Sequence, residues 1–161
     1  MLKNSLLLGF FFLLAIFSAC QKKAVYDGEA QLAVDEARIK KWADSVDVTL
    51  LRHESGLHYE ILNEGEGVRP ELIDSLVVEY EGRLLGDSLA FSKASDLQQY
   101  GFVLRKSIEG WKIGLPLIKL GGRIRLVIPS PLGYKDYLVG NLPRNAVLDF
   151  TIDLKEIIKD K

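Results

Sequence analysis

The sequence contains few of the residues that build metal, redox and nucleophilic sites. Its 161 residues include one cysteine and two histidines. His53 and His58 flank a turn and the start of an expected strand, and no cluster of cysteine, histidine or carboxylate stands around them at metal-ligand spacing. We therefore interpret both histidines as structural or solvated residues, and we expect neither a metal nor a cofactor.

Motifs for nucleotide binding and nucleophilic catalysis are also missing. The sequence has no G-x-S-x-G, no P-loop and no G-x-G-x-x-G after a strand, and the GEG at 65–67 indicates a turn. Lysine and arginine number 21 against 22 aspartates and glutamates, so the net charge of -1 gives no attraction to nucleic acid. Carboxylates such as Asp153 and Glu156 stand among alternating strand positions and indicate solvated faces. The sequence offers no acid–base pair.

One long apolar run is present, near the N-terminus. It reads LLLGFFFLLAIF over residues 6–17 and ends at Ser18, Ala19 and Cys20. At about 1.5 Å per residue it spans roughly 18 Å, less than the hydrocarbon layer of about 30 Å that a membrane-spanning helix crosses. The run therefore predicts a signal peptide at 1–19 rather than a resident transmembrane helix.

The sequence FSAC at the end of this run resembles the lipobox of bacterial lipoproteins. The resemblance implies cleavage before Cys20, acylation of that cysteine and a membrane tether over 20–27. A free cysteine near a plain cleavage site is the alternative, but a lone thiol in an oxidising compartment would have no disulfide partner. Acyl chains that bury about 0.8 kcal/mol per methylene would make the anchor effectively permanent.

The segment that follows predicts one amphipathic helix, which with its linker covers residues 28–50. Leu32, Ile39, Trp42 and Val46 recur at helical spacing, and no proline interrupts them. Because this apolar stripe is narrow, the helix either packs on the domain behind it or forms a stalk that also contacts a partner. We favour packing on the domain.

Residues 53–161 predict one α+β domain of short antiparallel strands. Apolar residues alternate with polar ones in four segments, namely GLHYEILNEGEG, SLVVEYEGRLL, GGRIRLVIP and AVLDFTIDLKEI. Between the second and third of these, Ile108, Trp111, Leu115 and Ile118 are spaced by three and four residues and predict a short helix. Pro116 limits or kinks this helix.

The order of the signals in this half closely resembles the FKBP-type peptidyl-prolyl cis-trans isomerases over roughly residues 56–158. The segments that carry the resemblance are VVEYEGRLL, AF after a turn, FVLRKSIEGW, GLPLIKLGGRIRLVIP, PLGY and LPRNAVLDFTIDL. Each segment alone is a weak signal, whereas their common order is specific. The resemblance implies a strongly curved antiparallel sheet wrapped around one short helix, with a hydrophobic cleft between the two.

The resemblance also assigns roles to individual residues. It places Trp111 at the floor of the cleft and makes the backbone amide of Ile108 a ligand contact. It makes Tyr134 a hydroxyl donor to a ligand carbonyl, and it places an aliphatic flap residue at Leu142. The aromatic wall positions fall on Tyr80, Phe91, Tyr100 and Phe150. Taken singly, Trp111, Phe91 and Phe150 indicate ordinary core residues, and Tyr134 a loop residue without a role.

Three residues depart from the family pattern. Ser92 follows Phe91 where active members carry an aspartate, Ser107 replaces an aliphatic wall residue, and Lys135 replaces a glycine after the loop tyrosine. We expect each change to make the cleft more polar or to weaken a ligand contact. The loss of one buried polar partner costs about 1–3 kcal/mol.

Two functions from different classes remain open. The first is a membrane-anchored prolyl isomerase that acts on proline-containing polypeptides and assists the folding of exported proteins in a bacterial cell envelope, on the periplasmic side of the outer membrane. The second is a catalytically weak binding or chaperone module of the same fold. The resemblance implies a macrolide as a further ligand, and no nucleic-acid partner is expected.

Overall fold

The computed structural model describes residues 25–95 and 100–159. Cys20 and the predicted signal peptide lie outside the described residues. The elements in chain order are α1 (Gly28–Ser45), β1 (Leu51–Arg52), β2 (His58–Asn63), β3 (Ser75–Leu84), β4 (Ala90–Ala94), β5 (Tyr100–Val103), η1 (Leu104–Lys106), α2 (Glu109–Gly114), η2 (Leu115–Leu117), β6 (Arg123–Ile128), η3 (Ser130–Leu132) and β7 (Leu148–Ile158). No helix among these residues is long and apolar enough to cross a membrane.

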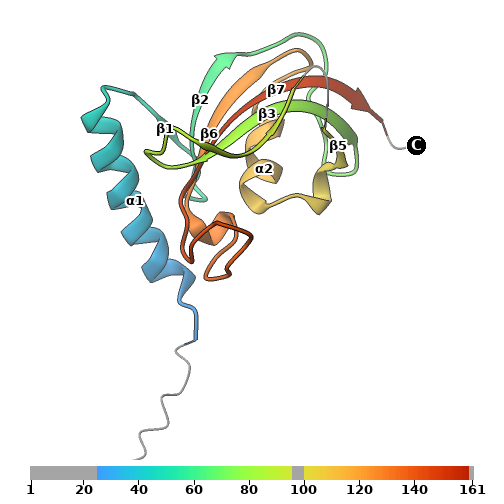
Figure 1. Cartoon of the computed structure of the whole chain (residues 1–161). Helices are drawn as coiled ribbons and strands as arrows, with labels where there is room; N and C mark the ends of the chain where they lie inside the picture. The colour runs from blue at the N-terminus through green and yellow to red at the C-terminus, as the bar shows by residue number, and fades with distance from the viewer. Residues whose placement is uncertain (1–24, 96–99, 160–161) are drawn as a thin grey trace, which may run out of the picture.

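All the strands belong to one antiparallel sheet. Its order is β1-β2-β6-β7-β3-β4, and β5 pairs with the part of β3 that precedes the β4 pairing. The long central strands β3 and β7 pair along almost their whole length, with a register shift between Val77 and Val78. The sheet curves into an arch, and α2 lies beneath it while α1 stands at one side (Figure 1). The predicted α+β class is thus confirmed.

Strands β6 and β7 separate two different environments. Their even-numbered residues from 124 to 128 and from 148 to 154 belong to the main core, and the list is Ile124, Leu126, Ile128, Leu148, Phe150, Ile152 and Leu154. Their odd-numbered neighbours Arg125, Val127 and Asp149 face the opposite side. This arrangement confirms the alternation expected from the sequence, because successive side chains of a strand point to opposite faces.

The short helix α2 lies directly on the concave face because two glycines let it approach. A Cβ atom added to Gly110 would lie 2.6 Å from Ile128 Cγ2, and one added to Gly114 would lie 2.5 Å from Leu126 Cδ2. The α-helical turns end at Gly114, and the chain continues as the 3-10 turn η2 with Pro116 inside it. Proline thus ends the α-helix as predicted, since it offers no amide hydrogen to the ladder.

Helix α1 packs on the domain through a mixed apolar and polar face. Asp27 caps its N-terminus by accepting from the amides of Glu29 and Ala30. Its buried residues are Asp35, Ile39 and Ala43. Of the predicted apolar stripe, only Ile39 is fully buried, and Val46 is 48% exposed. The stripe prediction was wrong in its details because the helix packs partly against a polar loop, described below.

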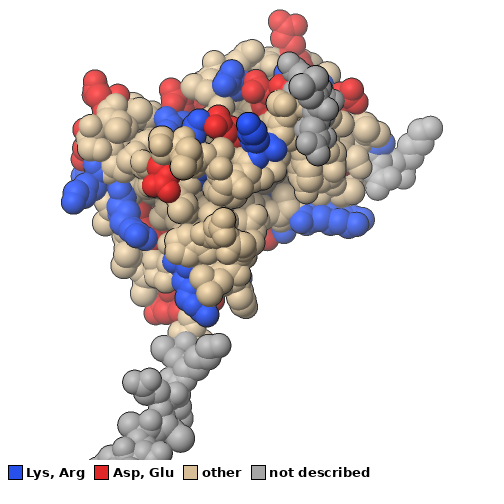
Figure 2. All heavy atoms as spheres, in the orientation of Figure 1, with Lys and Arg blue, Asp and Glu red and all other residues tan. Residues whose placement is uncertain are grey.

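Near its C-terminal end, α1 contacts the outer face of the sheet. Ile39 clusters with Val127 and Val147, and Trp42 packs at the edge of this cluster. The Arg125 guanidinium lies 4.8 Å from the centre of the Trp42 ring and donates two hydrogen bonds to Asp149, at 2.9 and 2.6 Å. On the face shown in Figure 2, acidic and basic side chains are interspersed rather than segregated.

Candidate functional site

A cleft of about 310 Å³ opens between α2 and the concave face of the sheet. Its lining residues are Tyr80, Phe91, Ser92, Tyr100, Lys106, Ser107, Ile108, Trp111, Tyr134 and Phe150. We call this set the aromatic cleft. It contains all but one of the cleft residues predicted from the sequence, drawn from β3, β4, β5, β7, α2, the link between η1 and α2, and the loop after η3.

Trp111 forms the centre of the aromatic cleft and is 5% exposed. Its ring centroid lies 5.3 Å from that of Tyr80 at an interplanar angle of 77°, and 5.2 Å from that of Phe150 at 85°. Phe102 packs on it as well, at 5.3 Å and 59°. Edge-to-face contacts of this kind add to the stabilisation from buried area. The indole therefore has a fixed orientation and does not depend on a ligand to hold it.

The aromatic wall is continued by β3 and β7. Gly82 on β3 lies opposite Phe150 on β7, and a Cβ atom at Gly82 would lie 2.4 Å from Phe150 Cε1. The Phe150 ring thus occupies the space that a side chain at Gly82 would need. Phe91 contacts the same ring edge-on, with centroids 5.6 Å apart. Glycine at position 82 is what allows this wall to close.

Ser92 contacts Tyr80 in the wall of the cleft. The two hydroxyl oxygens lie 2.7 Å apart, so one donates to the other. Ser92 therefore satisfies the Tyr80 hydroxyl, but with a neutral hydrogen bond, which is weaker than one that involves a carboxylate. Ser92 thus supplies a polar partner at this position, but without the negative charge of a carboxylate.

Ser107 lines the aromatic cleft, whereas Lys135 does not. The Ser107 hydroxyl donates to the Leu104 carbonyl at 2.7 Å, so its polar atom serves the turn before α2. Lys135 is exposed, has a φ of 55° and is not among the lining residues. The prediction that Lys135 makes the cleft more polar was therefore wrong, whereas Ser107 lines the cleft and its effect on polarity stays a prediction.

Two polar groups of the predicted site are available to a ligand. Ile108 precedes α2 and its carbonyl accepts from the amides of Trp111 and Lys112, whereas no hydrogen bond between described residues engages the Ile108 amide. Tyr134 lies half-buried after η3, and burial raises the pKa of its phenol, with smaller contributions from Tyr80 and Tyr100. Its hydroxyl is therefore protonated at neutral pH and can donate a hydrogen bond.

Tyr100 lines the aromatic cleft, whereas Leu142 lies beside it. Tyr100 is 47% exposed, lines the cleft and stacks on Phe102, with centroids 5.2 Å apart. Leu142 is 3% exposed and belongs to the core. It lines a neighbouring hollow that shares Phe91, Ser92 and Tyr134 with the aromatic cleft. Leu142 is thus adjacent to the cleft, but it does not line it as a flap.

Two residues of the site were missed by sequence reasoning. Lys106 lines the rim of the cleft and contributes the only charged side chain among the lining residues. Phe102 supports Trp111 and Tyr100 from behind. The alternation of Tyr100 and Phe102 along one strand was a signal for Phe102, whereas nothing in the sequence around Lys106 indicated its role. No group of side chains suited to a metal ion occurs in the described part of the chain.

Comparison with known proteins agrees with this geometry. The family model of the FKBP-type peptidyl-prolyl cis-trans isomerases matches residues 67–155, a range that includes every residue of the aromatic cleft. The chain belongs to this FKBP family. The matched range begins after α1, β1 and β2.

Individual FKBP relatives extend the similarity beyond that range. The chain is 37% identical over 134 residues to a probable FKBP-type isomerase FkpA of Neisseria meningitidis, covering 81% of this chain and 48% of the relative. It is 31% identical over 131 residues to FkpA of Escherichia coli, covering 80% and 48%. The chain therefore spans about half the length of the curated relatives it matches.

Solved FKBP structures show the same fold. The crystal structure of FkpA from Escherichia coli superimposes with a TM-score of 0.70 at 32% identity, covering 81% of this chain and 62% of that one. A peptidyl-prolyl isomerase from Pseudomonas syringae gives a TM-score of 0.67 at 25% identity, covering 84% and 98%. The FKBP-like α+β fold predicted from the sequence, with its preceding N-terminal helix, is confirmed.

Proposed function

We propose that this protein is a peptidyl-prolyl cis-trans isomerase that acts on proline-containing polypeptides. The observation that carries the proposal is the aromatic cleft itself, with an indole floor held edge-on between Tyr80 and Phe150. A prolyl ring is compact and apolar, so it can pack against an indole face. Membership of the FKBP family supports the same activity.

The chemistry of this reaction matches the residues that line the cleft. Rotation about an X-Pro amide must overcome a barrier of about 18–20 kcal/mol, because resonance gives the C–N bond partial double-bond character. No covalent bond to a heavy atom is made or broken, so the reaction needs no nucleophile and no acid–base pair. What lowers the barrier is an environment that favours the twisted amide over the planar one.

The cleft can provide that environment. A twisted amide has less charge separation than a planar one, so transfer from water into an aromatic cleft disfavours the planar ground state more. The prolyl ring would lie against Trp111. The Ile108 amide and the Tyr134 hydroxyl would donate to the carbonyls that flank the proline and would hold them while the amide rotates.

We further propose that Ser92 lowers the activity. The neutral bond between Tyr80 and Ser92 stands where active family members place a carboxylate, and a buried polar partner is worth about 1–3 kcal/mol. This corresponds to a loss of about fivefold to a hundredfold in efficiency. The same observation favours a second candidate function, a module that binds polypeptides or a macrolide in the cleft with little catalysis.

A protease-coupled assay with a proline-containing peptide tests the isomerase proposal. The chain should accelerate isomerisation, and Trp111→Ala should abolish the acceleration. Ser92→Asp should raise kcat/KM by fivefold or more. If the chain accelerates the reaction no more than Trp111→Ala does, the isomerase proposal fails. The binding module then stands if a proline peptide still binds and Trp111→Ala abolishes that binding.

We propose as well that the protein is anchored by lipid at Cys20 to a bacterial envelope membrane, on the periplasmic side of the outer membrane, where it assists the folding of exported proteins. The FSAC sequence after the apolar run supports the lipid anchor. Cells supplied with a radioactive fatty acid should label the protein and should not label Cys20→Ala. Label that persists in the variant, or a protein that fractionates away from the outer membrane, would contradict the anchor.

A further inference from the structure

A fully buried carboxylate on α1 reaches into the loop that carries Tyr134. Asp35 is 0% exposed. Its Oδ2 accepts from the Ser130 amide at 2.8 Å and from the Ser130 hydroxyl at 2.6 Å. Its Oδ1 accepts from Gln31 Nε2 at 2.8 Å and lies 3.6 Å from the Arg38 guanidinium. A carboxylate without such partners would be costly to bury, so these contacts determine where the charge can lie.

Ser130 in turn closes the loop around Tyr134. Its carbonyl accepts from the Gly133 amide at 3.0 Å and from the Lys135 amide at 2.8 Å. These two amides stand directly before and after Tyr134 in the chain. Hydrogen bonds on both sides of Tyr134 therefore converge on one residue, and the amide and hydroxyl of that residue are held by Asp35.

We infer that Asp35 is a positioning residue for Tyr134. This inference rests on the proposed isomerase function, in which the Tyr134 hydroxyl orients a substrate carbonyl. Asp35 fixes the backbone of Ser130, Ser130 fixes the turn from Gly133 to Lys135, and the turn aims the Tyr134 ring into the aromatic cleft. Helix α1, which precedes the residues matched by the family model, thereby contributes to the site.

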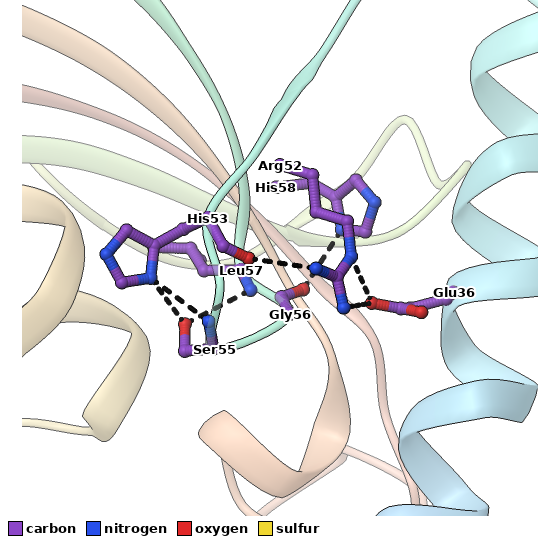
Figure 3. Close-up of polar contacts among 7 residues, drawn as sticks. All are labelled: Glu36, Arg52, His53, Ser55, Gly56, Leu57 and His58. Carbon is purple, nitrogen blue, oxygen red and sulfur yellow. Dashed lines mark hydrogen bonds and ion pairs between the residues drawn. The ribbon is translucent and has the colours of Figure 1, made fainter.

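Attachment of α1 does not by itself require a buried charge. Ile39 and Trp42 pack on the sheet, and Leu32 covers Gly56, where an added Cβ would lie 2.7 Å from Leu32 Cδ1. Glu36, the next residue after Asp35, binds Arg52 on β1 through Nε and Nη2, both at 2.7 Å (Figure 3). That ion pair lies on the side of the turn 53–58, and Glu36 makes no contact with the Ser130 loop in the described structure.

Glu36 therefore supplies a matched control for Asp35. Asp35→Ala and Glu36→Ala each remove one carboxylate from the middle of α1, but only the first releases Ser130. We expect Asp35→Ala to lower kcat/KM about tenfold, mainly through kcat, because a poorly aimed donor affects orientation. Glu36→Ala should change it less than twofold. Asp35→Asn should recover most of the loss, since an amide oxygen can still accept from Ser130. These assays use the full chain in detergent, at a temperature where circular dichroism shows each variant folded.

A double-mutant cycle separates positioning from general loosening. In the Tyr134→Phe background the hydroxyl is already absent, so Asp35→Ala should lower kcat/KM less than twofold further. An equal loss in both backgrounds would overturn the inference, as would a folded Asp35→Ala variant with the activity of Glu36→Ala. If Asp35→Ala does not fold, Ser130→Ala, which removes one of the two hydrogen bonds, takes its place in the cycle.

A second measurement does not depend on activity. Hydrogen exchange of the Gly133 and Lys135 amides should become faster in Asp35→Ala and stay unchanged in Glu36→Ala. Should the wild-type chain show no isomerase activity, the proposed function fails, and the exchange rates still decide whether Asp35 holds the Tyr134 loop. Unchanged exchange at both amides would show that it does not.

Discussion

The two faces of strands β6 and β7 are built from different chemistry. On the concave face, the aromatic cleft and the core beneath it contain no ion pair between described residues, and the side chains around Trp111 are neutral aromatic rings. On the outer face, Arg125 binds Asp149 and lies over Trp42. Each face thus has one tryptophan, with uncharged neighbours in one case and a cation in the other.

This difference follows from what each face has to do. A cleft that favours a twisted, less polar amide must not offer charges that would stabilise the planar form. The outer face has no such requirement and joins α1 to the sheet with directional polar contacts. There, the hydrogen bonds that Arg125 donates to Asp149 raise the pKa of the Arg125 guanidinium above its ordinary value. Among its described lining residues the cleft has one charged side chain, the exposed Lys106, whereas the rings packed around Trp111 are neutral.

The two tryptophans give the largest expected contrast. Trp111→Ala should lower the free energy of unfolding by about 3–5 kcal/mol, because it empties the centre of the core cluster. It should also abolish isomerase activity. Trp42→Ala should cost about 2 kcal/mol, from a half-buried ring and its contact with Arg125, with kcat/KM unchanged. Denaturant titration and the peptide assay measure the two effects.

Equal losses of activity in the two tryptophan variants would contradict the separation of the faces. That result would mean that Trp42, which attaches α1 to the outer face of the sheet, affects catalysis as strongly as Trp111 in the cleft.

Gly82 offers a smaller perturbation of the cleft alone. Gly82→Ala places a methyl group where the Phe150 ring lies, so the ring must shift. Overpacking of this kind costs about 1–3 kcal/mol, and kcat/KM should fall as the wall moves. Gly101→Ala is the matched control, because a Cβ there lies 4.0 Å from its nearest neighbour, the Leu76 carbonyl oxygen. Crystal structures or aromatic NMR signals of Phe150 report the shift.

An unchanged Phe150 ring in Gly82→Ala would show that the strands spread instead. Stability would then fall without an effect on activity, and the wall would not depend on the glycine.

Much of the fold was predictable because its signals are local. Alternation in GGRIRLVIP and AVLDFTIDLKEI predicted the strands and their inward residues from Leu126 to Leu154, since each side chain's face follows from its place in the strand. Strands β4 and β5 were not predicted as strands. Both are short and lie along one edge of β3, and their residues are half-buried or exposed, so they carry no alternation of burial.

The site was predictable where the family resemblance located it, and much less so elsewhere. Trp111, Tyr134 and Phe150 lie in the cleft as expected. Leu142 is buried in the core and lines a hollow next to the cleft rather than the cleft itself. Asp35 escaped notice because a charged residue in an amphipathic helix usually indicates a solvated face. Its partner, Ser130, lies 95 residues away, so no local pattern could indicate the contact.

The smallest expected effect is the pH dependence of stability that arises from His58, which lies near Glu36 of α1. Desolvation lowers the pKa of His58, while the nearby Glu36 carboxylate and a hydrogen bond with the Gly56 carbonyl raise it less. The unfolded chain therefore takes up this proton first as the pH falls through about 6.5. The contribution of His58 to stability is complete above that pH and is lost as the pH falls from there to the lowered value in the folded protein. His58→Gln should flatten this part of the stability curve, measured by denaturant titration between about pH 7.5 and pH 5.5.

Glu36→Gln should have the opposite effect, because the Glu36 carboxylate raises the pKa of His58. Without the carboxylate, the main opposition to desolvation disappears while Arg52 still lowers the pKa of His58. The folded protein then resists protonation more strongly, and stability should fall more steeply below pH 6.5 than in the wild type. Isomerase activity per folded molecule should stay constant over the same range, because His58 and Glu36 lie outside the aromatic cleft. A steeper loss of activity than of folded protein would mean that protonation of His58 lowers catalysis in the cleft.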